Sequence, residues 1–391
     1  MSTLSRLPKG VHMAKCDIAD AYRIIPLHPS EYPKLGMEWR GKYYYDKYLP
    51  QGCGSSCRIF EAFSTALEAI FKFYHPDAEI QHMIDDFLFI ALTFKQCSIL
   101  LKDFIQLCKD IGVPLAPDKT TVPDTTVIFL GIHLNSLTRT ASLPTEKTKS
   151  YVQDIETYLT RKKLKQKELQ SIVGKLNFAA AVVPARPFLY RLIKKIYSVY
   201  KPYHKIWLTA EMKEDLRTWL QFLKNYNGVT LFRALNLTPS HAINLGSDAS
   251  SKGLGACFGD QWIQAAYTGD WVGLPIHVLE LYPLLVLIVM FGEKLRNNSV
   301  LFLCDNQAVV DIIKSQSSSC PNVMKIMRPL TLQLIKFNIY LTAAHIPGKM
   351  NILPDLISRF QVTPQVLRNF KMRPKATPIP WRYLPENYRL N

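Results

Sequence analysis

Four acidic residues spread over residues 243–360 restrict the fold of this chain more than any other feature of its sequence. Each lies at the end of an apolar run or near the start of a helical pattern, in the order strand end, helix, strand end, helix start. This alternation predicts an α/β domain in which the ends of these elements meet at one cleft. The four residues are Asp248, Glu280, Asp305 and Asp355.

Four carboxylates around one cleft can bind two divalent cations, Mg²⁺ or Mn²⁺, which activate water on one side of a phosphodiester and stabilise the leaving oxygen on the other. His345 precedes Asp355 by ten residues, and its titration range suits proton or product handling. The alternative for each acid is a cap or a turn. Ser247-Asp248 could cap a helix, and Asp305-Asn306 could form an Asx turn.

The order of these residues resembles ribonuclease H over residues 243–360, with all four acids matched. This resemblance implies a ribonuclease H-like α/β domain that cleaves the RNA strand of RNA–DNA hybrids. It also implies that the four acids are metal ligands, and that His345 matches the mobile histidine of the family.

A second group of carboxylates comes earlier in the chain. Asp17 ends the β-type run from Val11, and Asp85-Asp86 lies between two apolar flanks. Acids at strand ends can converge, and packing a third carboxylate beside an adjacent pair requires divalent cations to neutralise the cluster. Two Mg²⁺ ions would activate a 3′-hydroxyl and hold a triphosphate there. Asp-Asp taken alone fits a polar hairpin turn better.

The sequences of residues 17–27, 49–52 and 83–86 resemble reverse-transcriptase motifs A, B and C, and residues 117–119 and 129–132 resemble motifs D and E. This resemblance implies a polymerase palm that uses deoxynucleotides and a template–primer. Asp17 and Asp85 would be metal ligands, and Asp86 a nearby carboxylate. Tyr22 would be the gate under the sugar, Gln51 of the Gln51-Gly52 pair would contact the nucleotide, and Lys119 would protonate pyrophosphate. The alternatives are a core tyrosine for Tyr22 and a surface lysine for Lys119.

Positive charge predicts a polyanionic partner. The chain has a formal charge of +17, and residues 160–205 contain twelve Lys or Arg against Glu168 alone. A solvated helix face is the alternative. Residues 168–178 resemble the thumb helix that follows the minor groove in reverse transcriptases, with Gln170, Gly174 and Phe178 on one face. Gly174 fits close approach to a sugar or, equally, a helix–helix contact. The predicted nucleic-acid contacts are Lys162, Lys163, Gln170, Gly174, Lys175 and Phe178.

These patterns predict a multidomain fold of the α+β and α/β classes. We expect a palm at 1–144, a helical thumb or connection at 145–237, a ribonuclease H-like domain at 238–360, and a proline-rich tail at 361–391 that is extended or disordered. The apolar run Leu281 to Gly292 is too short for a bilayer and predicts a buried helix, so no membrane partner is expected. Scattered cysteines predict reduced thiols in an intracellular protein, cytoplasmic or nuclear.

The amino-acid sequence of residues 52–60, 173–178 and 207–211 resembles that of retrotransposons of the DIRS type, which encode a tyrosine recombinase. Only sixteen residues precede Asp17, so we expect the fingers subdomain to be missing and polymerisation to be impaired. Two hypotheses follow. The chain is a reverse transcriptase with ribonuclease H activity, or it is a catalytically silent remnant that still binds nucleic acid.

Overall fold

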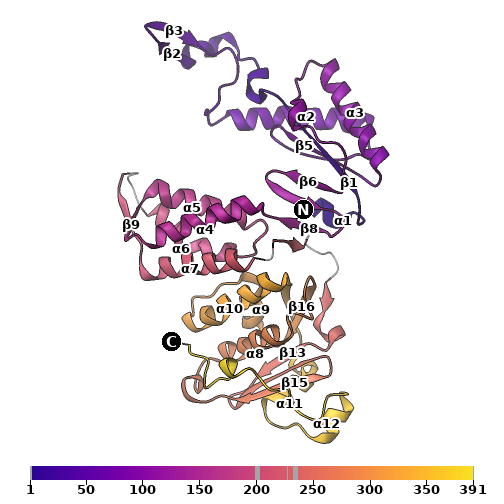
Figure 1. Ribbon diagram of the computed structural model, residues 1–391, viewed down its shortest axis with the longest axis vertical. Coiled ribbons are helices and arrows are strands. Elements are labelled where there is room, and N and C mark those ends of the chain that lie inside the picture. Colours follow the sequence, from indigo (N-terminus) through magenta and orange to yellow (C-terminus); the bar gives the residue numbers. More distant parts are fainter. Residues whose placement is uncertain (1, 199–202, 227, 232–236, 391) are drawn as a thin grey trace. The chain divides into compact units, whose positions relative to one another are not determined.

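The computed structural model describes residues 2–198, 203–226, 228–231 and 237–390. Two compact units, residues 1–142 and 143–391, make up the chain, and Figure 1 colours them from indigo to yellow along the sequence. The predicted class, mixed helix and sheet in a multidomain chain, is confirmed. The predicted helical and nuclease segments both lie within the second unit, so the boundary near residue 237 stays a prediction.

The first unit is built on an antiparallel sheet in the strand order β1-β5-β4. Helix α2 packs on β4, and helix α3 packs on β1 and β5. The helices bury one apolar face each, and Phe60, Phe71, Phe89 and Phe104 join them to the sheet in one core. The bounds are β1 His12–Asp17, α2 Ser56–Tyr74, β4 Glu79–Met83, β5 Asp86–Ala91 and α3 Phe94–Asp110.

Smaller elements surround this sheet. The hairpin of β2 and β3 exposes all of its residues, and β6, β7 and β8 form an antiparallel meander. The segment that resembles motif E forms a hairpin, because Leu130-Gly131 between β6 and β7 is a tight turn with positive φ at both residues. The bounds are α1 Ser2–Arg6, β2 Gly36–Trp39, β3 Lys42–Tyr45, β6 Thr126–Phe129, β7 Ile132–Asn135 and β8 Thr140–Ser142.

The second unit begins with helices, which lie in the segment expected to be a helical thumb or connection, residues 145–237. Helices α4, α5, α6 and α7 pack together, and the short antiparallel pair β9–β10 joins their ends. Thr209 caps α7 by accepting a hydrogen bond from the Met212 N–H. The bounds are α4 Thr145–Leu159, β9 Lys163–Lys165, α5 Gln166–Ala179, α6 Tyr190–Tyr197, β10 Lys205–Trp207 and α7 Ala210–Asn225.

The rest of the second unit is an α/β assembly. Strands β13, β14 and β15 are antiparallel, whereas β12, β16 and β17 are parallel. Helix α8 lies against β13 and β14 on one side and α10 on the other. The bounds are β11 Thr230–Leu231, β12 Thr238–Pro239, β13 Gly246–Ala249, β14 Gly253–Phe258, β15 Gln261–Ala266, α8 Ile276–Phe291, β16 Ser299–Cys304, α9 Gln307–Ser315, α10 Pro321–Phe337, β17 Tyr340–His345, α11 Ile352–Ser358 and α12 Pro364–Asn369.

Helix α8 contains the apolar run that was predicted to form a buried helix. Every residue from Leu281 to Ile288 is buried, so the prediction is confirmed. Among the described residues, no helix combines the length and apolar character needed to span a bilayer. All eight cysteines lie within the described residues and are free thiols.

The C-terminal tail, which was expected to be extended or disordered, contains helix α12 and is anchored to the core of the second unit. The Trp271 Nε1–H donates to the Pro385 carbonyl at 2.8 Å, and the Tyr282 hydroxyl donates to the Tyr383 carbonyl at 2.7 Å. Ile379 and Leu390 are buried in the core that surrounds α8. Single aromatic and aliphatic residues anchor the tail between prolines, a pattern without the periodicity that reveals a helix or strand.

Candidate active sites

The first carboxylate cluster forms where β1 ends and β5 begins. Asp17 and Asp86 face each other in the register of these two strands, and the Ile18 N–H donates to the Asp85 carbonyl at 3.0 Å. Asp17 is buried, and Asp85 and Asp86 are half-buried. The structure therefore brings together the three acids that the sequence placed at strand ends.

The charges of this cluster act on one another. Burial and the neighbouring carboxylates of Asp17 and Asp85 raise the pKa of Asp86. The Lys119 ammonium donates to Asp17 Oδ1 at 2.9 Å, and this hydrogen bond raises the pKa of Lys119. Lys119 reaches the cluster from a 3₁₀ turn, Pro117–Lys119, while its side chain remains half exposed. Lys119 is therefore an exposed lysine that also contacts Asp17, and its role in catalysis stays a prediction.

The predicted nucleotide-binding residues lie on the loops around this cluster. Tyr22 belongs to a 3₁₀ turn, Ala21–Ile24, and its hydroxyl lies 3.0 Å from the Cys57 Sγ. That hydrogen bond raises the pKa of Tyr22, and the ring packs edge-on against Phe60 at 5.5 Å. Gln51 and Gly52 are exposed in a turn, where Gly52 has a φ of +85°. Tyr22 is only partly buried, so its ring is not enclosed by the core.

The second cluster gathers acids from three elements of the α/β assembly. Asp248 lies on β13, Glu280 on α8, and Asp305 directly after β16. Burial raises the pKa of Asp248 to about 6 and that of Glu280 to about 7, and the negative charge of Asp305 adds to both shifts. The Ser358 hydroxyl donates to Asp248 Oδ2 at 2.7 Å and opposes the shift of Asp248.

Glu280 carries an unsatisfied polar atom. Its Oε2 is buried and has no hydrogen-bond partner among the described residues. Glu280, Cys304 and Asp305 each offer one ligand atom within 4.8 Å of the other two. Burial raises the pKa of the Cys304 thiol to about 12, so this group stays protonated and is a poor ligand. The pair of carboxylates is the part of this group that suits a hard cation.

Asp355 and His345 lie at the border of the second cluster. Asp355 is on α11 and accepts from the Arg359 Nε at 2.6 Å, while its charge also contributes to the raised pKa of Asp248. His345 is exposed at the end of β17, with its Nε2 3.2 Å from the Asp305 carbonyl. The structure therefore brings all five predicted residues to one end of the sheet strands.

Sequence reasoning missed two polar groups of this site. The Asn351 side-chain amide donates to Asp305 Oδ1 at 3.1 Å and to the Ser247 carbonyl at 3.2 Å, and Ser358 holds Asp248. These bonds fix the orientation of two carboxylates. Asn351 lies between His345 and Asp355, within the residues that resemble ribonuclease H, so its position offered a signal. Ser358 offered none.

Both clusters fit divalent cations by the chemistry of their donors. Oxygen ligands with mutually raised pKa values are what Mg²⁺ and Mn²⁺ prefer, and the unpartnered Glu280 Oε2 lacks the hydrogen bond that a buried carboxylate oxygen otherwise makes. In the first cluster, Lys119 supplies the positive charge that Asp17 contacts.

The predicted nucleic-acid contacts lie on α5 and the adjoining strand β9. Gln170 and Gly174 are exposed, and no described heavy atom beyond the nearby backbone of its own helix comes within 4 Å of a Cβ built on Gly174. The helix–helix explanation of this glycine is therefore wrong. Phe178 is half-buried on the same face, with the Lys147 ammonium 4.3 Å from its ring centre.

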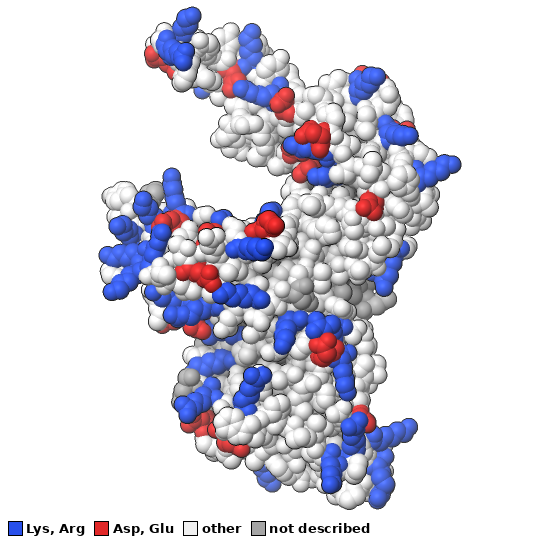
Figure 2. Space-filling view, in the orientation of Figure 1, with Lys and Arg blue, Asp and Glu red and all other residues white. Residues whose placement is uncertain are grey.

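Lysines gather around this face, as Figure 2 shows over β9 and the ends of its neighbouring helices. Lys162 and Lys163 are exposed, and the Lys163 ammonium lies 4.0 Å from the ring centre of Trp207. Lys175 instead binds the Asp154 carboxylate at 2.5 Å, so part of its charge is balanced within the protein. Lys201, another residue of the basic segment, lies outside the described residues.

Comparison with known proteins finds a family match over the residues that contain the first cluster. Residues 1–134 match the family described as reverse transcriptase (RNA-dependent DNA polymerase). The Gag-Pro-Pol polyprotein of squirrel monkey retrovirus is 27% identical over 136 residues, which cover 33% of this chain and 7% of the polyprotein. The Pro-Pol polyprotein of feline foamy virus is 28% identical over 206 residues, which cover 51% of this chain and 16% of the polyprotein.

A solved structure of the foamy viral protease–reverse transcriptase in complex with RNA/DNA hybrid is 19% identical, with a TM-score of 0.47. The match covers 96% of this chain and 48% of that protein. This chain therefore spans less than half of that enzyme and under a fifth of the two retroviral polyproteins. Residues 1–134, which contain the Asp17, Asp85 and Asp86 cluster, match the reverse-transcriptase family, and the chain is similar in sequence to retroviral and foamy-virus Pol polyproteins.

Proposed function

We propose that this chain is a reverse transcriptase with ribonuclease H activity that acts on RNA–DNA hybrids and a template–primer. The observation that carries the proposal is the meeting of Asp17, Asp85 and Asp86 at one end of a sheet, within the residues that match the reverse-transcriptase family. Asp17 and Asp85 would hold two Mg²⁺ or Mn²⁺ ions, which supply charge neutralisation and an activated 3′-hydroxyl.

The chain's own residues have separate tasks in nucleotide addition. The Lys119 ammonium, already within hydrogen-bond distance of Asp17, would donate a proton to departing pyrophosphate. The Tyr22 ring, fixed by Phe60 and Cys57, would exclude a ribose 2′-hydroxyl. Gln51 would contact the incoming deoxynucleotide from its exposed turn.

Primer extension on an RNA template tests this proposal. The chain should add deoxynucleotides to an annealed DNA primer in the presence of Mg²⁺ or Mn²⁺, and Asp85→Asn should lower the rate by more than about a hundredfold. Extension that persists in Asp85→Asn, or in excess EDTA, would refute the assignment of the site.

The second cluster supports a hydrolytic activity on the same substrate. Asp248, Glu280, Asp305 and Asp355 would hold two divalent cations that activate water for attack on the RNA strand. The buried and unpartnered Glu280 Oε2 favours this role over a cap or turn, because a capping carboxylate has a backbone partner. His345, exposed beside Asp305, would handle the proton or the product.

Hydrolysis of a labelled RNA–DNA hybrid tests the second activity. Asp248→Asn should abolish cleavage while hybrid affinity changes little, because the rate depends on the metal ligands and binding depends mainly on phosphate contacts. Hybrid binding without cleavage by the unmodified chain would instead favour the runner-up function, a catalytically silent nucleic-acid-binding remnant of a retroelement.

The finer assignments belong to the same proposal. The amino-acid sequence of residues 52–60, 173–178 and 207–211 supports an origin in a DIRS-type retrotransposon. An intracellular location, cytoplasmic or nuclear, suits eight free cysteines and a nucleic-acid substrate. The helices around α5 and β9 would bind the duplex as a thumb, with Lys162 and Lys163 near phosphates.

A further inference from the structure

Ile84, which lies next to the carboxylates of the first cluster, has an unfavourable backbone conformation. It lies in the turn between β4 and β5, directly before Asp85-Asp86, and its φ is +56°. This left-handed region is rare for any residue with a side chain and a true outlier for a β-branched one. Such a conformation persists only where neighbouring groups impose it.

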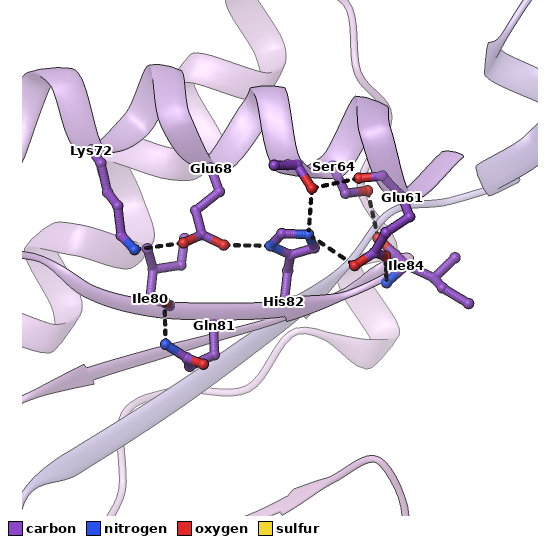
Figure 3. A network of polar contacts seen from close by, with 9 residues as sticks. Glu61, Ser64, Glu68, Lys72, Ile80, Gln81, His82 and Ile84 are labelled. Carbon is purple, nitrogen blue, oxygen red and sulfur yellow. Dashed lines mark hydrogen bonds and ion pairs between the residues drawn. The ribbon is translucent and has the colours of Figure 1, made fainter. Parts of the chain in front are cut away.

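Helix α2 supplies those neighbouring groups. The Ile84 N–H donates to Glu61 Oε2 at 2.8 Å, and the Ile84 carbonyl accepts from the Ser64 hydroxyl at 2.5 Å. Ser64 is completely buried, so its hydroxyl is shielded from competing water. Both backbone polar groups of the strained residue are thus bound by two side chains, one turn apart on the same helix (Figure 3).

Glu61 is in turn held by a row of polar side chains from α2 and β4 that Figure 3 draws between the two elements. His82 Nε2 lies 3.4 Å from Glu61 Oε1, and His82 Nδ1 is hydrogen-bonded to Glu68. The Lys72 ammonium donates to Glu68 at 2.5 Å. Burial opposes ionisation of Glu68, but Lys72 and His82 outweigh it and lower its pKa, so Glu68 is ionised and can orient the imidazole.

The other side of the turn is tied to β1. The Asp85 carbonyl accepts from the Ile18 N–H at 3.0 Å, next to Asp17, and the His82 ring stacks on Phe87 with ring centres 5.3 Å apart. A shift of Ile84 would therefore move Asp85 relative to Asp17. Holding reacting groups to within about 1 Å is what a two-carboxylate site needs for fast transfer.

We propose that Glu61 and Ser64, oriented through His82, are positioning residues that hold Ile84 in the left-handed conformation and so place the Asp85 carboxylate beside Asp17. This inference rests on the proposed polymerase function. Glu61, Ser64 and His82 have no proposed contact with substrate. They act on nucleotide addition through the backbone of the turn.

Two substitutions at Glu61 test whether its hydrogen bond with the Ile84 N–H controls the rate of nucleotide addition. Glu61→Ala removes the acceptor of the Ile84 N–H and should lower the single-turnover rate of nucleotide addition by about tenfold to a hundredfold, with the apparent nucleotide affinity nearly unchanged. Glu61→Gln keeps an acceptor oxygen and should recover most of the rate. Glu79→Ala, an exposed glutamate on β4, is the matched control and should leave the rate unchanged.

Coupling to residue 84 makes the test specific. Asparagine adopts the left-handed region far more readily than isoleucine, so in an Ile84→Asn background the loss caused by Glu61→Ala should shrink to less than about threefold. Equal losses in the two backgrounds, or no loss from Glu61→Ala when the unmodified chain extends primers, would overturn the inference.

Hydrogen exchange at the Ile84 amide provides a test that does not depend on catalytic activity. The full chain, without nucleotides, should protect this amide, and protection should fall by at least about tenfold in Glu61→Ala and remain in Glu79→Ala. Unchanged protection in Glu61→Ala would show that Glu61 does not hold the backbone of Ile84. If the unmodified chain failed to extend primers, the polymerase proposal would fail, and the exchange result would still decide whether Glu61 holds the turn.

Discussion

Glu280 shows at the scale of one residue how a site can lower the stability of the fold that carries it. Burial raises its pKa from 4.5 to about 7. Between these two values the unfolded chain has released a proton that the folded chain still binds, so the free energy of unfolding falls as pH rises from about 4.5 to about 7 and stays low above that. A divalent cation beside the carboxylate would offset this loss.

Glu280→Gln should therefore stabilise the metal-free protein while abolishing hybrid cleavage. In EDTA at pH 8 we expect a higher melting temperature. The free energy of unfolding should rise by an amount on the order of 1 kcal/mol once solvent screening of this partly exposed carboxylate is allowed for. The gain should vanish near pH 4. Glu214→Gln, at an exposed position, is the control. A melting temperature at pH 8 that is equal to or below that of the unmodified chain would contradict this account of Glu280.

Tyr22 gives a second residue-scale prediction. Tyr22→Ala removes the ring that packs on Phe60 and should raise incorporation of ribonucleotides relative to deoxynucleotides by at least about tenfold, because the 2′-hydroxyl no longer meets a ring. Tyr22→Phe removes only the hydroxyl that contacts Cys57, so it should keep the discrimination. Selectivity is measured as the ratio of the two kcat/KM values. A role limited to core packing predicts equal ratios in all three proteins.

The sequence predicted which acids meet but not how they are held. Asp17, Asp85 and Asp86 were recognisable because acids follow apolar runs, and strand ends are where a sheet presents functional groups. The partners that orient them are distant in sequence. Ser358 lies 110 residues from Asp248, and Glu61 reaches the Ile84 backbone from another element, so neither contact leaves a local pattern.

At the scale of elements, the basic surface on β9 and α5 is the proposed nucleic-acid contact. Lys162, Lys163, Lys165 and Lys167 are all exposed, whereas Arg161 pairs with Glu168 at 2.8 Å. Each lysine that contacts a phosphate should contribute a slope of about −0.7 to −0.9 to the plot of log affinity against log salt concentration.

Changing these four lysines to glutamine should flatten that plot for hybrid binding by about two units or more. The control changes four exposed lysines of the first unit, Lys9, Lys95, Lys102 and Lys109, and so removes the same net charge. The comparison is made by fluorescence anisotropy with one labelled hybrid over a range of salt. Equal slopes for the two quadruple variants would mean that the basic surface is a solvated face.

The C-terminal tail is an element that the sequence did not reveal. Its Tyr388 ring packs against Tyr282 with ring centres 4.9 Å apart, and its hydroxyl donates to the Lys325 carbonyl at 3.0 Å. Tyr388→Ala should lower the free energy of unfolding by about 2 to 4 kcal/mol. Trp381→Ala, at an exposed position in the same tail, should cost much less. Similar losses in urea unfolding would show that the tail is not anchored at Tyr388.

At the scale of the whole molecule, the chain has two proposed active sites, each with its own carboxylates and each in its own unit. The boundary between the units, after residue 142, falls close to the palm boundary expected at 144, because the change from mixed to helical pattern is visible in the sequence. The expected division of the second unit near residue 237 stays a prediction, since its helical and α/β parts form one compact body.

One substrate measures both activities at once: an RNA template labelled at one end, annealed to a DNA primer with a different label, in the presence of Mg²⁺ and deoxynucleotides. The unmodified chain should lengthen the primer and shorten the RNA. Asp85→Asn should lose lengthening and keep shortening, and Asp248→Asn should do the reverse. A chain that does neither, or a single substitution that abolishes both while the protein remains folded, would contradict the claim of two independent sites.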